Sequence, residues 1–447
     1  MTKCAFIPNI FRFYNILWDA ALPFLKQHPR LAPTFDRRIN PVHLQPADIW
    51  IQAASAGEAY LAVSIIKALN PDRPVTMLLT TTTDQGMKIL TQELLPEEFS
   101  HHIRLCFDIF PFDSPKAMNN AVQRVNPAVM VLLETELWPA HLYALKRNHT
   151  SVLIINGRLS RKSGRNYRLT KAFWQSFAPE RILAISAKDA QRFSQVFPHT
   201  CIGTMDNIKF DRMTVQKTPG KVSALAAIVP RELPLSVFAS FRRQEEPQIL
   251  DMVKTLLEEV PNQVIALFPR HMHRIAPFLK KLNKTGLNVY QGSQISSVLT
   301  GPAIILWDRF GDLHQAYSHA DVVFVGGSLA PLGGQNFMEP AALGIPTITG
   351  PHWQDFAWVG KEIFRTGAVT RCNNWQHAVK TMCSHLVNSG SRKTRIDAVS
   401  RYISQKQGGA QTAADAILTS WEAKQPGAVA GRKKSRRSSG DTLPLTY

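Results

Sequence analysis

The chain has 447 residues, of which 45% are hydrophobic, and this length exceeds what one hydrophobic core usually supports, so two globular domains are expected. Its five cysteines are scattered without CxxC spacing, which argues against a disulfide framework or a zinc site and favours a reducing, cytosolic compartment. A formal net charge of +19 predicts anionic partners, which could be nucleic acid, phosphorylated metabolites or an acidic membrane face.

The N-terminal segment 7–25 is apolar but too often interrupted to cross a bilayer. Asn9, Arg12, Asn15 and Asp19 break the run, and no secretory cleavage pattern follows it. Its apolar residues recur at helical spacing, which predicts an amphipathic helix. A helix on a membrane surface and a helix packed on the protein's own core explain this pattern equally well.

Short β-branched runs alternate with amphipathic stretches from residue 48 onward, which is typical of βαβ units and a parallel sheet. A turn-rich interval at about 211–234 separates two such series. The sequence therefore predicts an α/β fold with two doubly wound, Rossmann-like sheets, whose ligands bind at the carboxyl ends of strands. The expected strands are Ile49–Ala53, Val75–Thr80, Ala128–Leu133, Val152–Ile155, Ile182–Ile185, Leu235–Ala239, Gln263–Phe268, Ala303–Leu306, Val322–Val325 and Pro346–Thr349.

The first expected strand runs into small residues, 53–57, that allow a tight turn before a helix predicted at about Glu58–Leu69. Two interpretations of the carboxylate are open. Either Glu58 points into the ligand crevice, or Ser55 caps the helix while Glu58 bonds back to it in a capping box. Spacing alone favours the cap.

A second acidic segment, Glu134-Thr135-Glu136-Leu137-Trp138-Pro139, directly follows the apolar run 129–133. Acidic side chains at the carboxyl end of a buried strand face either solvent or a ligand. If Glu58 and Glu134 follow neighbouring strands, they provide a base and a residue that orients it or tunes its pKa. A surface loop explains the sequence equally well.

In the second half, Pro269-Arg270-His271 places a guanidinium directly after a predicted strand. Arginine is suited to phosphate there because its donation is planar and bidentate. His271 and His273 have no third ligand near them in the sequence, so ordinary loop histidines are favoured over a metal site. Neither a metal nor a cofactor is expected.

The most distinctive segment, Gly326–Pro340, contains two glycine pairs. A buried strand ends at the first pair, and the second pair, Gly333-Gly334, is expected to open a helix, where backbone N–H groups can approach phosphate oxygens. Glu339 within that helix suits hydrogen bonding to a ribose diol. The segment predicts a site for a nucleotide phosphate, and glycines that only make tight turns are the weaker alternative.

The C-terminal segment 421–447 is basic, rich in Gly, Ser and Pro, and without apolar periodicity, so it is expected to be disordered. A solvated tail and a tether to a membrane or nucleic acid both fit its composition.

Six motifs together resemble those of the Kdo transferases, which pass 3-deoxy-D-manno-oct-2-ulosonic acid (Kdo) from CMP-Kdo to lipid A precursor. They occur in the family's order and cover about residues 48–368. The motifs are Trp50-x-x-Ala53-Ala54-Ser55-x-Gly57-Glu58, Glu134-Thr135-Glu136-Leu137-Trp138-Pro139, Asn156-x-Arg158-Leu159-Ser160, Asn207-x-Lys209-Phe210-Asp211, Pro269-Arg270-His271, and Gly326-Gly327-Ser328 through Glu339-Pro340.

This resemblance implies a GT-B fold, in which two Rossmann-like domains face each other across a cleft, and an inverting transfer without a required metal. The implied division is an amphipathic, possibly membrane-associating segment at 1–40, an acceptor domain at 41–215, a CMP-sugar domain at 216–420 and a disordered basic tail at 421–447. The implied partners are CMP-Kdo, lipid A precursor (lipid IVA) and the anionic inner-membrane surface, where the protein would be peripheral on the cytoplasmic face. No nucleic acid partner is expected.

The resemblance also implies the site residues. Glu58 would be the base that deprotonates the acceptor hydroxyl, and Glu134 would bind the acceptor or support that base. Asn207 and Lys209 would lie at the domain junction near the donor. The implied acceptor residues are Ser55, Gly57, Arg158 and Ser160, and the implied CMP residues are Arg270, Ser328, Gly333, Gly334, Asn336 and Glu339.

The chain departs from the family pattern beside the implied donor site. Phe241-Arg242 stands where relatives usually have Thr-His, and Gln335 replaces part of a Gly-Gly-His-Asn run. The nearest alternative is another GT-B sugar-nucleotide transferase of envelope lipid biosynthesis, such as a lipid A disaccharide synthase-like enzyme. A nucleic-acid-binding protein is a different class, but the chain lacks interleaved basic and aromatic motifs.

Overall fold

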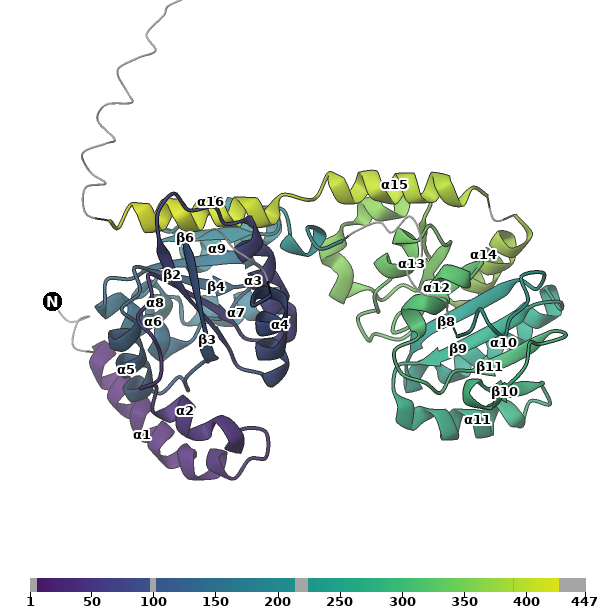
Figure 1. The fold of residues 1–447 in the computed structure, drawn as a ribbon, viewed down its shortest axis with the longest axis horizontal. Coiled ribbons are helices and arrows are strands. Elements are labelled where there is room, and N and C mark those ends of the chain that lie inside the picture. Colours follow the sequence, from purple (N-terminus) through teal and green to yellow (C-terminus); the bar gives the residue numbers. More distant parts are fainter. Residues whose placement is uncertain (1–5, 97–101, 214–223, 389, 426–447) are drawn as a thin grey trace, which may run out of the picture. The chain divides into compact units, whose positions relative to one another are not determined.

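The computed structural model describes residues 6–96, 102–213, 224–388 and 390–425. The chain divides into two compact units (Figure 1). The first consists of the described part of residues 1–212 and 406–447, and the second of the described part of 213–405.

The first unit is built on seven parallel strands in the order β3-β2-β1-β4-β5-β6-β7. The strands are β1 (Ile49–Ala53), β2 (Val75–Thr81), β3 (Ile103–Ile109), β4 (Val129–Leu133), β5 (Ser151–Gly157), β6 (Arg181–Ala184) and β7 (Cys201–Thr204). The helices are α1 (Phe6–Lys26), α2 (Phe35–Ile39), α3 (Ala56–Ala68), α4 (Asp84–Leu94), α5 (Pro115–Val125), α6 (Pro139–Arg147), α7 (Arg161–Leu169), α8 (Lys171–Gln175), α9 (Ala187–Val196) and α16 (Gly409–Glu422), with 3₁₀ turns at Ala32–Thr34 and Ile208–Phe210.

Helices cover both faces of this sheet, so its central strands are apolar on both sides. Every residue of β1 and β4 is buried. Along β1, Ile49 and Ile51 pack in a cluster with α3, α4 and α16, whereas Trp50 packs in the opposite cluster with α5 and α6. This alternation follows from the two-residue period of a strand.

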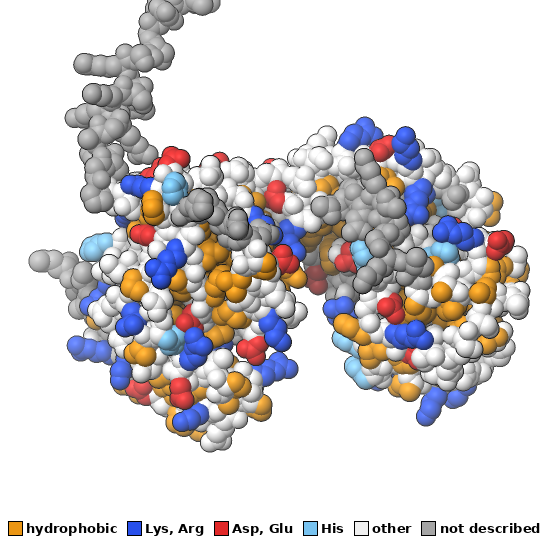
Figure 2. Space-filling view, viewed as in Figure 1, with side chains coloured by type: hydrophobic (Ala, Val, Ile, Leu, Met, Phe, Trp, Pro, Cys, Tyr) orange, Lys and Arg blue, Asp and Glu red, His pale blue; other side chains and the backbone are white. Residues whose placement is uncertain are grey.

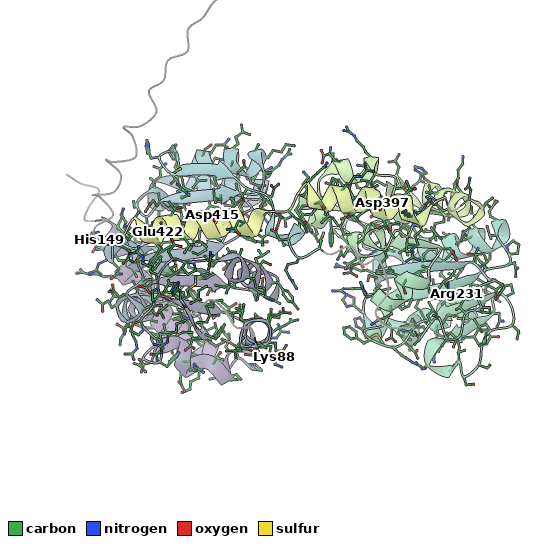
Figure 3. The ribbon with its side chains drawn as sticks, turned by 45° about the horizontal axis from the view of Figure 1, so that its top comes forward. Lys88, His149, Arg231, Asp397, Asp415 and Glu422 are labelled. Carbon is green, nitrogen blue, oxygen red and sulfur yellow. The ribbon has the colours of Figure 1, made fainter. Side chains whose placement is uncertain are left out.

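Helix α16 returns to the first unit, which corrects the predicted boundary of the second domain at residue 420 (Figure 1). Its N-terminus is fixed by Asp211, whose carboxylate accepts the N–H groups of Gly408 and Ala410 at 2.7 and 2.9 Å. Ile417 and Trp421 enter the core against α3, while Asp415 and Glu422 of the same helix are exposed (Figure 3). Burial of apolar side chains therefore decides where this segment belongs.

The predicted tail needs a related correction at its start. Trp421 and Glu422 still belong to α16, and Trp421 is only 2% exposed. Residues 426–447, which carry the basic cluster of the tail, lie outside the described residues.

The second unit also has seven parallel strands, in the order β10-β11-β9-β8-β12-β13-β14. The strands are β8 (Leu235–Phe241), β9 (Val264–Pro269), β10 (Val289–Gln291), β11 (Ala303–Leu306), β12 (Val322–Val325), β13 (Thr347–Thr349) and β14 (Val369–Arg371). The helices are α10 (Glu246–Glu259), α11 (Ile275–Asn283), α12 (Leu313–His319), α13 (Met338–Ala342), α14 (Trp375–Val387) and α15 (Arg392–Ser404), with 3₁₀ turns at Arg243–Glu245, Met272–Arg274, Gly292–Gln294, Gln354–Val359 and Lys361–Arg365.

One face of helix α1 packs on the first unit, as one of the two interpretations of its sequence predicted. Phe11 is buried and stacks on Tyr143 with ring centroids 4.1 Å apart, so one face packs on the first unit. Another set of large apolar side chains on α1 is 50–77% exposed, namely Phe13, Ile16, Leu17 and Phe24. Within the described chain, no helix is both long and apolar enough to span a bilayer.

Candidate active site

The strand order of each sheet reverses at one pair of neighbours, and the functional candidates follow those strands. In the first unit the reversal lies between β1 and β4, which precede Glu58 and Glu134. In the second unit it lies between β8 and β12, which precede Arg242 and Gly326. Ligands of doubly wound sheets bind at these switch points.

Glu58 lies in the first turn of α3, in an arrangement close to the predicted capping box. Ser55 caps the helix by accepting the N–H of Glu58 at 3.4 Å, and Glu58 Oε2 accepts the N–H of Ala54 at 2.6 Å. The return bond thus goes to Ala54 and not to Ser55 as predicted. The carboxyl is buried, and Gly57 beside it is exposed.

Burial, and after it the negative charges of Glu136 and Glu134, raise the pKa of Glu58 to about 7 against the opposing hydrogen bond from Ala54. The pKa of Glu136 is also raised, first by burial. A carboxyl whose pKa lies near neutrality can both accept and release a proton under physiological conditions. The cluster therefore has the electrostatics of a general base.

Glu134 sits in the left-handed backbone region, with φ of +55°, directly after β4. This conformation costs free energy in a residue with a side chain, and such strained residues are concentrated at functional sites. The Lys209 Nζ group lies 2.8 Å from Glu134 Oε1 and forms a salt bridge with it. The lysine thus balances one of the three clustered carboxylates.

The Asn207 and Lys209 motif lies in the first unit, where it supports this acidic cluster. The side-chain oxygen of Asn207 accepts the N–H of Lys209 at 3.0 Å, and that of Asn156 accepts the N–H of Ile208 at 3.0 Å. These bonds fix the turn that carries the lysine against Glu134. The resemblance implied a place at the domain junction near the donor, and the described contacts of both residues tie them to the acidic cluster of the first unit.

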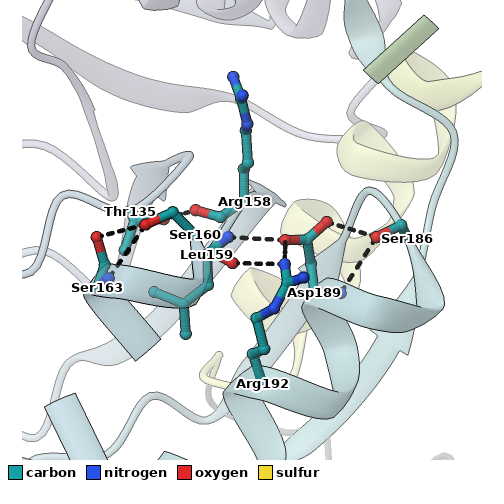
Figure 4. Close-up of polar contacts among 8 residues, drawn as sticks. All are labelled: Thr135, Arg158, Leu159, Ser160, Ser163, Ser186, Asp189 and Arg192. Carbon is teal, nitrogen blue, oxygen red and sulfur yellow. Dashed lines mark hydrogen bonds and ion pairs between the residues drawn. The ribbon is translucent and has the colours of Figure 1, made fainter. Parts of the chain in front are cut away.

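Arg158 and Ser160 lead from β5 into α7 (Figure 4). The hydroxyl of Thr135, between the two glutamates, donates to the carbonyl oxygen of Arg158. Ser160 caps α7 by accepting the N–H of Ser163 at 3.1 Å. The acidic loop and the start of α7 are therefore joined, although the Ser160 hydroxyl has a structural role as a cap.

In the second unit, the backbone donors of the glycine-rich segment already bind a carboxylate of the protein. Glu245 is fully buried, and its Oε1 accepts the N–H groups of Ser328 and Leu329 at 2.8 and 2.9 Å. Its Oε2 accepts those of Gly327 and Arg242 at 2.6 and 2.9 Å. This arrangement is an anion nest occupied from within.

Ser328 consequently does not match its predicted role as a CMP contact. Its side chain is fully buried, and its hydroxyl donates to Val325 O at 2.6 Å and accepts the N–H of Gly350 at 2.8 Å. Gly326 packs against Phe241 so closely that an added Cβ would lie 2.4 Å from the Phe241 Cα. The first glycine pair therefore serves close packing.

The second glycine pair does not open a helix, because α13 begins only at Met338. Gly333 and Gly334 have φ values of +89° and +86° and form a loop in which the Gly334 N–H donates to Gly327 O at 2.7 Å. Asn336 Nδ2 donates to Glu339 Oε1 at 2.7 Å, and both side chains are partly exposed. Asn336 and Glu339 are thus brought together, as the prediction of a shared site requires.

Positive charge gathers where β8 and β9 end. A bulge at Ser240, where φ is +54°, precedes Arg242, and Arg242 Nε is buried without a partner among the described residues. Arg270 follows β9 and is exposed. Partial desolvation, His273 and these two arginines lower the pKa of His271, which shows that the groups are close enough to interact. Such a cluster can bind a phosphate.

Sequence reasoning missed three members of the sites, namely Glu136, Arg242 and Glu245. Glu136 was present in a quoted motif, and Arg242 had been recorded only as a departure from the family. Nothing in the sequence pairs Glu245 with a segment 82 residues away. No group of three or more potential metal ligands occurs in the part of the chain that the structure describes.

Known proteins share both the sequence and the fold. Residues 26–212 match the family described as 3-deoxy-D-manno-octulosonic-acid transferase (kdotransferase). The 3-deoxy-D-manno-octulosonic acid transferase of Haemophilus influenzae is 29% identical over 356 residues, which are 78% of this chain and 82% of that protein. Its namesake from Bordetella pertussis is 29% identical over 378 residues, 83% of this chain and 87% of the relative.

A crystal structure of a glycosyltransferase from Rickettsia africae superimposes with a TM-score of 0.53 at 11% identity, covering 85% of this chain and 99% of that one. The two Rossmann-like units therefore have the GT-B fold. Through its first unit, and through relatives that match most of its length, the chain is similar to the Kdo transferases.

Proposed function

We propose that the protein transfers Kdo from CMP-Kdo to a lipid A precursor in lipopolysaccharide biosynthesis. The similarity to the Kdo transferases supports this reaction class. The observation that carries the proposal is the carboxyl of Glu58, buried beside Glu134 and Glu136, with its pKa raised to about 7. A base tuned to neutrality is what activation of an acceptor hydroxyl needs.

In the proposed reaction, a hydroxyl oxygen of the acceptor attacks the anomeric carbon of Kdo while Glu58 takes its proton. The bond between that carbon and the phosphate oxygen breaks, and CMP leaves with the electron pair. Attack from the face opposite CMP inverts the anomeric configuration. Glu134, held by Lys209, and Glu136 keep the Glu58 pKa high enough for it to act as a base near pH 7.

For the donor, the proposal assigns phosphate binding to Arg270 and Arg242, because both lie at the switch-point edge of the second sheet. Asn336 and Glu339 offer partly exposed polar groups for the nucleoside. The proposal does not assign the backbone N–H groups of 327–329 to the donor phosphate, since Glu245 already accepts them. Preorganised cations of this kind can lower the barrier by several kcal/mol by stabilising the leaving phosphate.

The direct test incubates the purified protein with CMP-Kdo and tetraacylated lipid A precursor and resolves the products by mass. An acceptor heavier by one or more Kdo residues, together with free CMP, is the expected result. A folded protein that releases no CMP and leaves the acceptor mass unchanged would refute the proposed reaction.

The charge of Glu136 should set the pH at which the enzyme becomes active. Wild-type kcat/KM is expected to rise with pH through an apparent pKa near 7, because Glu58 must lose its proton to act as a base. Glu136→Gln removes a negative charge that raises this pKa, so the rising limb should move to lower pH. The measurement is a pH profile of kcat/KM for both proteins.

Glu93→Gln is the control for the pH profile, because Glu93 is an exposed carboxylate on α4 of the same unit. Its profile should superimpose on the wild type. If the rising limb of the kcat/KM profile of Glu136→Gln lies at the same pH as that of the wild type, Glu136 does not tune the pKa of the base.

We propose a peripheral location on the cytoplasmic face of the bacterial inner membrane. The exposed apolar side chains of α1 support it, since an amphipathic helix binds a bilayer by burying such a face among the lipid headgroups. The excess of Lys and Arg adds attraction to anionic lipids, so binding should weaken at high salt.

Replacing Phe24, which is 77% exposed, should weaken binding to vesicles of anionic phospholipid. Phe24→Ser is expected to lower the partition coefficient about tenfold, because a buried Phe contributes roughly 1.5–3 kcal/mol. Phe310→Ser is the matched control, since Phe310 is 90% exposed in the second unit. Equal losses in the two variants, measured by vesicle sedimentation, would remove α1 as the anchor.

A further inference from the structure

A basic groove of about 600 Å³ lies between α7 and α9 of the first unit. Its other lining residues are two glutamines and a glycine, and no carboxylate lines it. The cations that line it are Arg161, Lys162, Arg165, Arg168, Lys188 and Arg192. Its volume falls in the range of sites that hold small ligands.

The cations of the groove repeat at helical spacing. Arg161, Arg165 and Arg168 lie at i, i+4 and i+7 of α7, and Lys188 and Arg192 lie at i and i+4 of α9. Like charges at such spacing repel and destabilise a helix. On the face drawn in Figure 2, by contrast, Lys and Arg side chains lie singly or in small groups. An anion in the groove would offset the repulsion.

Most of these cations have no salt bridge to an acidic residue of the described chain. In the ranges that the structure describes, no salt bridge involves Arg161, Lys162, Arg165, Arg168 or Lys188. Each of the four α7 cations is an i, i+3 or i+4 neighbour of another cation, so their charge is concentrated and uncompensated. Exposed and unpaired, they are available to a ligand.

Arg192 is fixed in place by the protein itself (Figure 4). Its Nη1 donates to Leu159 O at 2.8 Å and to Asp189 Oδ1 at 3.1 Å, and Asp189 also accepts the N–H of Leu159 at 3.0 Å. The Nε and Nη2 donors have no hydrogen-bond partner in the described chain. A guanidinium held in this way loses little entropy when it binds a phosphate.

The groove shares α7 with the acidic cluster. Tyr167, on another face of α7, has its pKa raised by burial and then by the charge of Glu136, so the side of the helix that carries Tyr167 lies near the cluster. At its other end, α7 follows Arg158, whose carbonyl accepts the Thr135 hydroxyl. A ligand in the groove would therefore be held by the same helix that borders the proposed base.

We propose that the α7/α9 groove binds a phosphate group of the lipid acceptor and so positions the sugar hydroxyl for transfer; this inference rests on the proposed function. Phosphate is the ligand chemistry that arginine clusters recognise with charge-assisted, bidentate hydrogen bonds. An extended polyanion would need a long track of cations, whereas these line a single groove. A phosphorylated lipid thus fits better than a nucleic acid.

The kinetic test compares Arg165→Gln/Arg168→Gln with the control Lys88→Gln/Arg104→Gln, which removes the same charge from exposed positions of the same unit. The groove variant should raise the acceptor KM by roughly tenfold or more, given the strength of hydrogen bonds between charged groups. Its KM for CMP-Kdo and its kcat should stay within about twofold. On an acceptor stripped of its phosphates, all three proteins should behave alike.

A binding test keeps this inference separate from the transfer reaction. Titration calorimetry with glucosamine 1-phosphate, and with inorganic phosphate, should show binding to the wild type and the control but about tenfold weaker binding to the groove variant. That loss would support the groove even if no Kdo were transferred. Normal transfer with an unchanged acceptor KM in the groove variant would overturn the groove inference and leave the proposed transfer reaction standing.

The remaining outcomes concern the source of the phosphate. Weaker binding of inorganic phosphate with an unchanged acceptor KM would overturn the lipid as its source. Tighter binding of a short oligonucleotide than of glucosamine 1-phosphate, lost in the groove variant, would overturn the proposal in favour of nucleic acid.

Discussion

Glu58→Gln is expected to lower kcat for Kdo transfer by roughly 10²–10⁴-fold, because the amide cannot accept the proton of the attacking hydroxyl. The side chain keeps its size, and its amide oxygen can still accept the N–H of Ala54. The KM values for donor and acceptor should therefore change little. Steady-state kinetics at pH 8, where wild-type Glu58 is ionised, give the comparison.

Stability distinguishes loss of the base from loss of the fold. Glu58 has a folded pKa of about 7, raised from 4.5, so the stabilisation that its protonated form provides is present below about pH 4.5 and is lost as the pH rises to about 7. Above pH 7 the wild type buries a charge that the amide variant lacks. The variant's Tm at pH 8 should equal or exceed that of the wild type.

Two results would contradict this assignment. Transfer at more than a tenth of the wild-type rate by folded Glu58→Gln would remove Glu58 as the base. A Tm well below the wild type at pH 8, with activity lost in proportion, would make Glu58 a structural helix cap only. Glu93→Gln, with its exposed carboxylate, should leave both kcat and Tm unchanged.

The central strands of both sheets could be predicted from sequence, and the edge strands could not. Strands β1, β4, β8 and β12 are continuous apolar runs because helices cover both faces of the sheet. The four strands missed, β3, β7, β10 and β14, form the edges of the two sheets. Edge strands are partly exposed and carry mixed side chains, so their sequences resemble those of loops.

The site was predictable where it follows directly from strand order. Glu58 and Glu134 meet because each follows a strand and the two strands are neighbours, which an α/β pattern with conserved handedness makes probable. Lys209 could not be assigned in this way, because it reaches Glu134 through a turn after the edge strand β7. Long-range pairs of this kind depend on tertiary packing that no local pattern encodes.

In the glycine-rich segment, a strong sequence pattern predicted the backbone geometry but not the group that the backbone binds. Two glycine pairs after a buried strand predicted a phosphate cradle, and backbone N–H groups do converge there. The anion that they bind is Glu245, which lies in a polar run after β8 and looked like a loop residue. Backbone geometry was therefore predictable, but its ligand was not.

Glu245→Gln is expected to destabilise the second unit by about 2–6 kcal/mol, since each buried donor left unpaired costs roughly 1–3 kcal/mol. Each carboxylate oxygen of Glu245 accepts two N–H groups. An amide has one oxygen, so two of the four donors would face an NH₂ group. Urea unfolding should report the loss, and amide hydrogen exchange should speed up either at Ser328 and Leu329 or at Gly327 and Arg242, depending on which oxygen is replaced.

The location of the faster exchange separates this interpretation from a general effect of removing a charge. Glu258→Gln changes an exposed carboxylate on α10 of the same unit and should alter neither the unfolding curve nor the exchange. If Glu245→Gln left protection of the 327–329 amides intact, the carboxylate would not be what holds the glycine-rich segment. If protection is lost, the segment depends on an internal anion, and the donor phosphate must be bound by side chains such as Arg242 and Arg270.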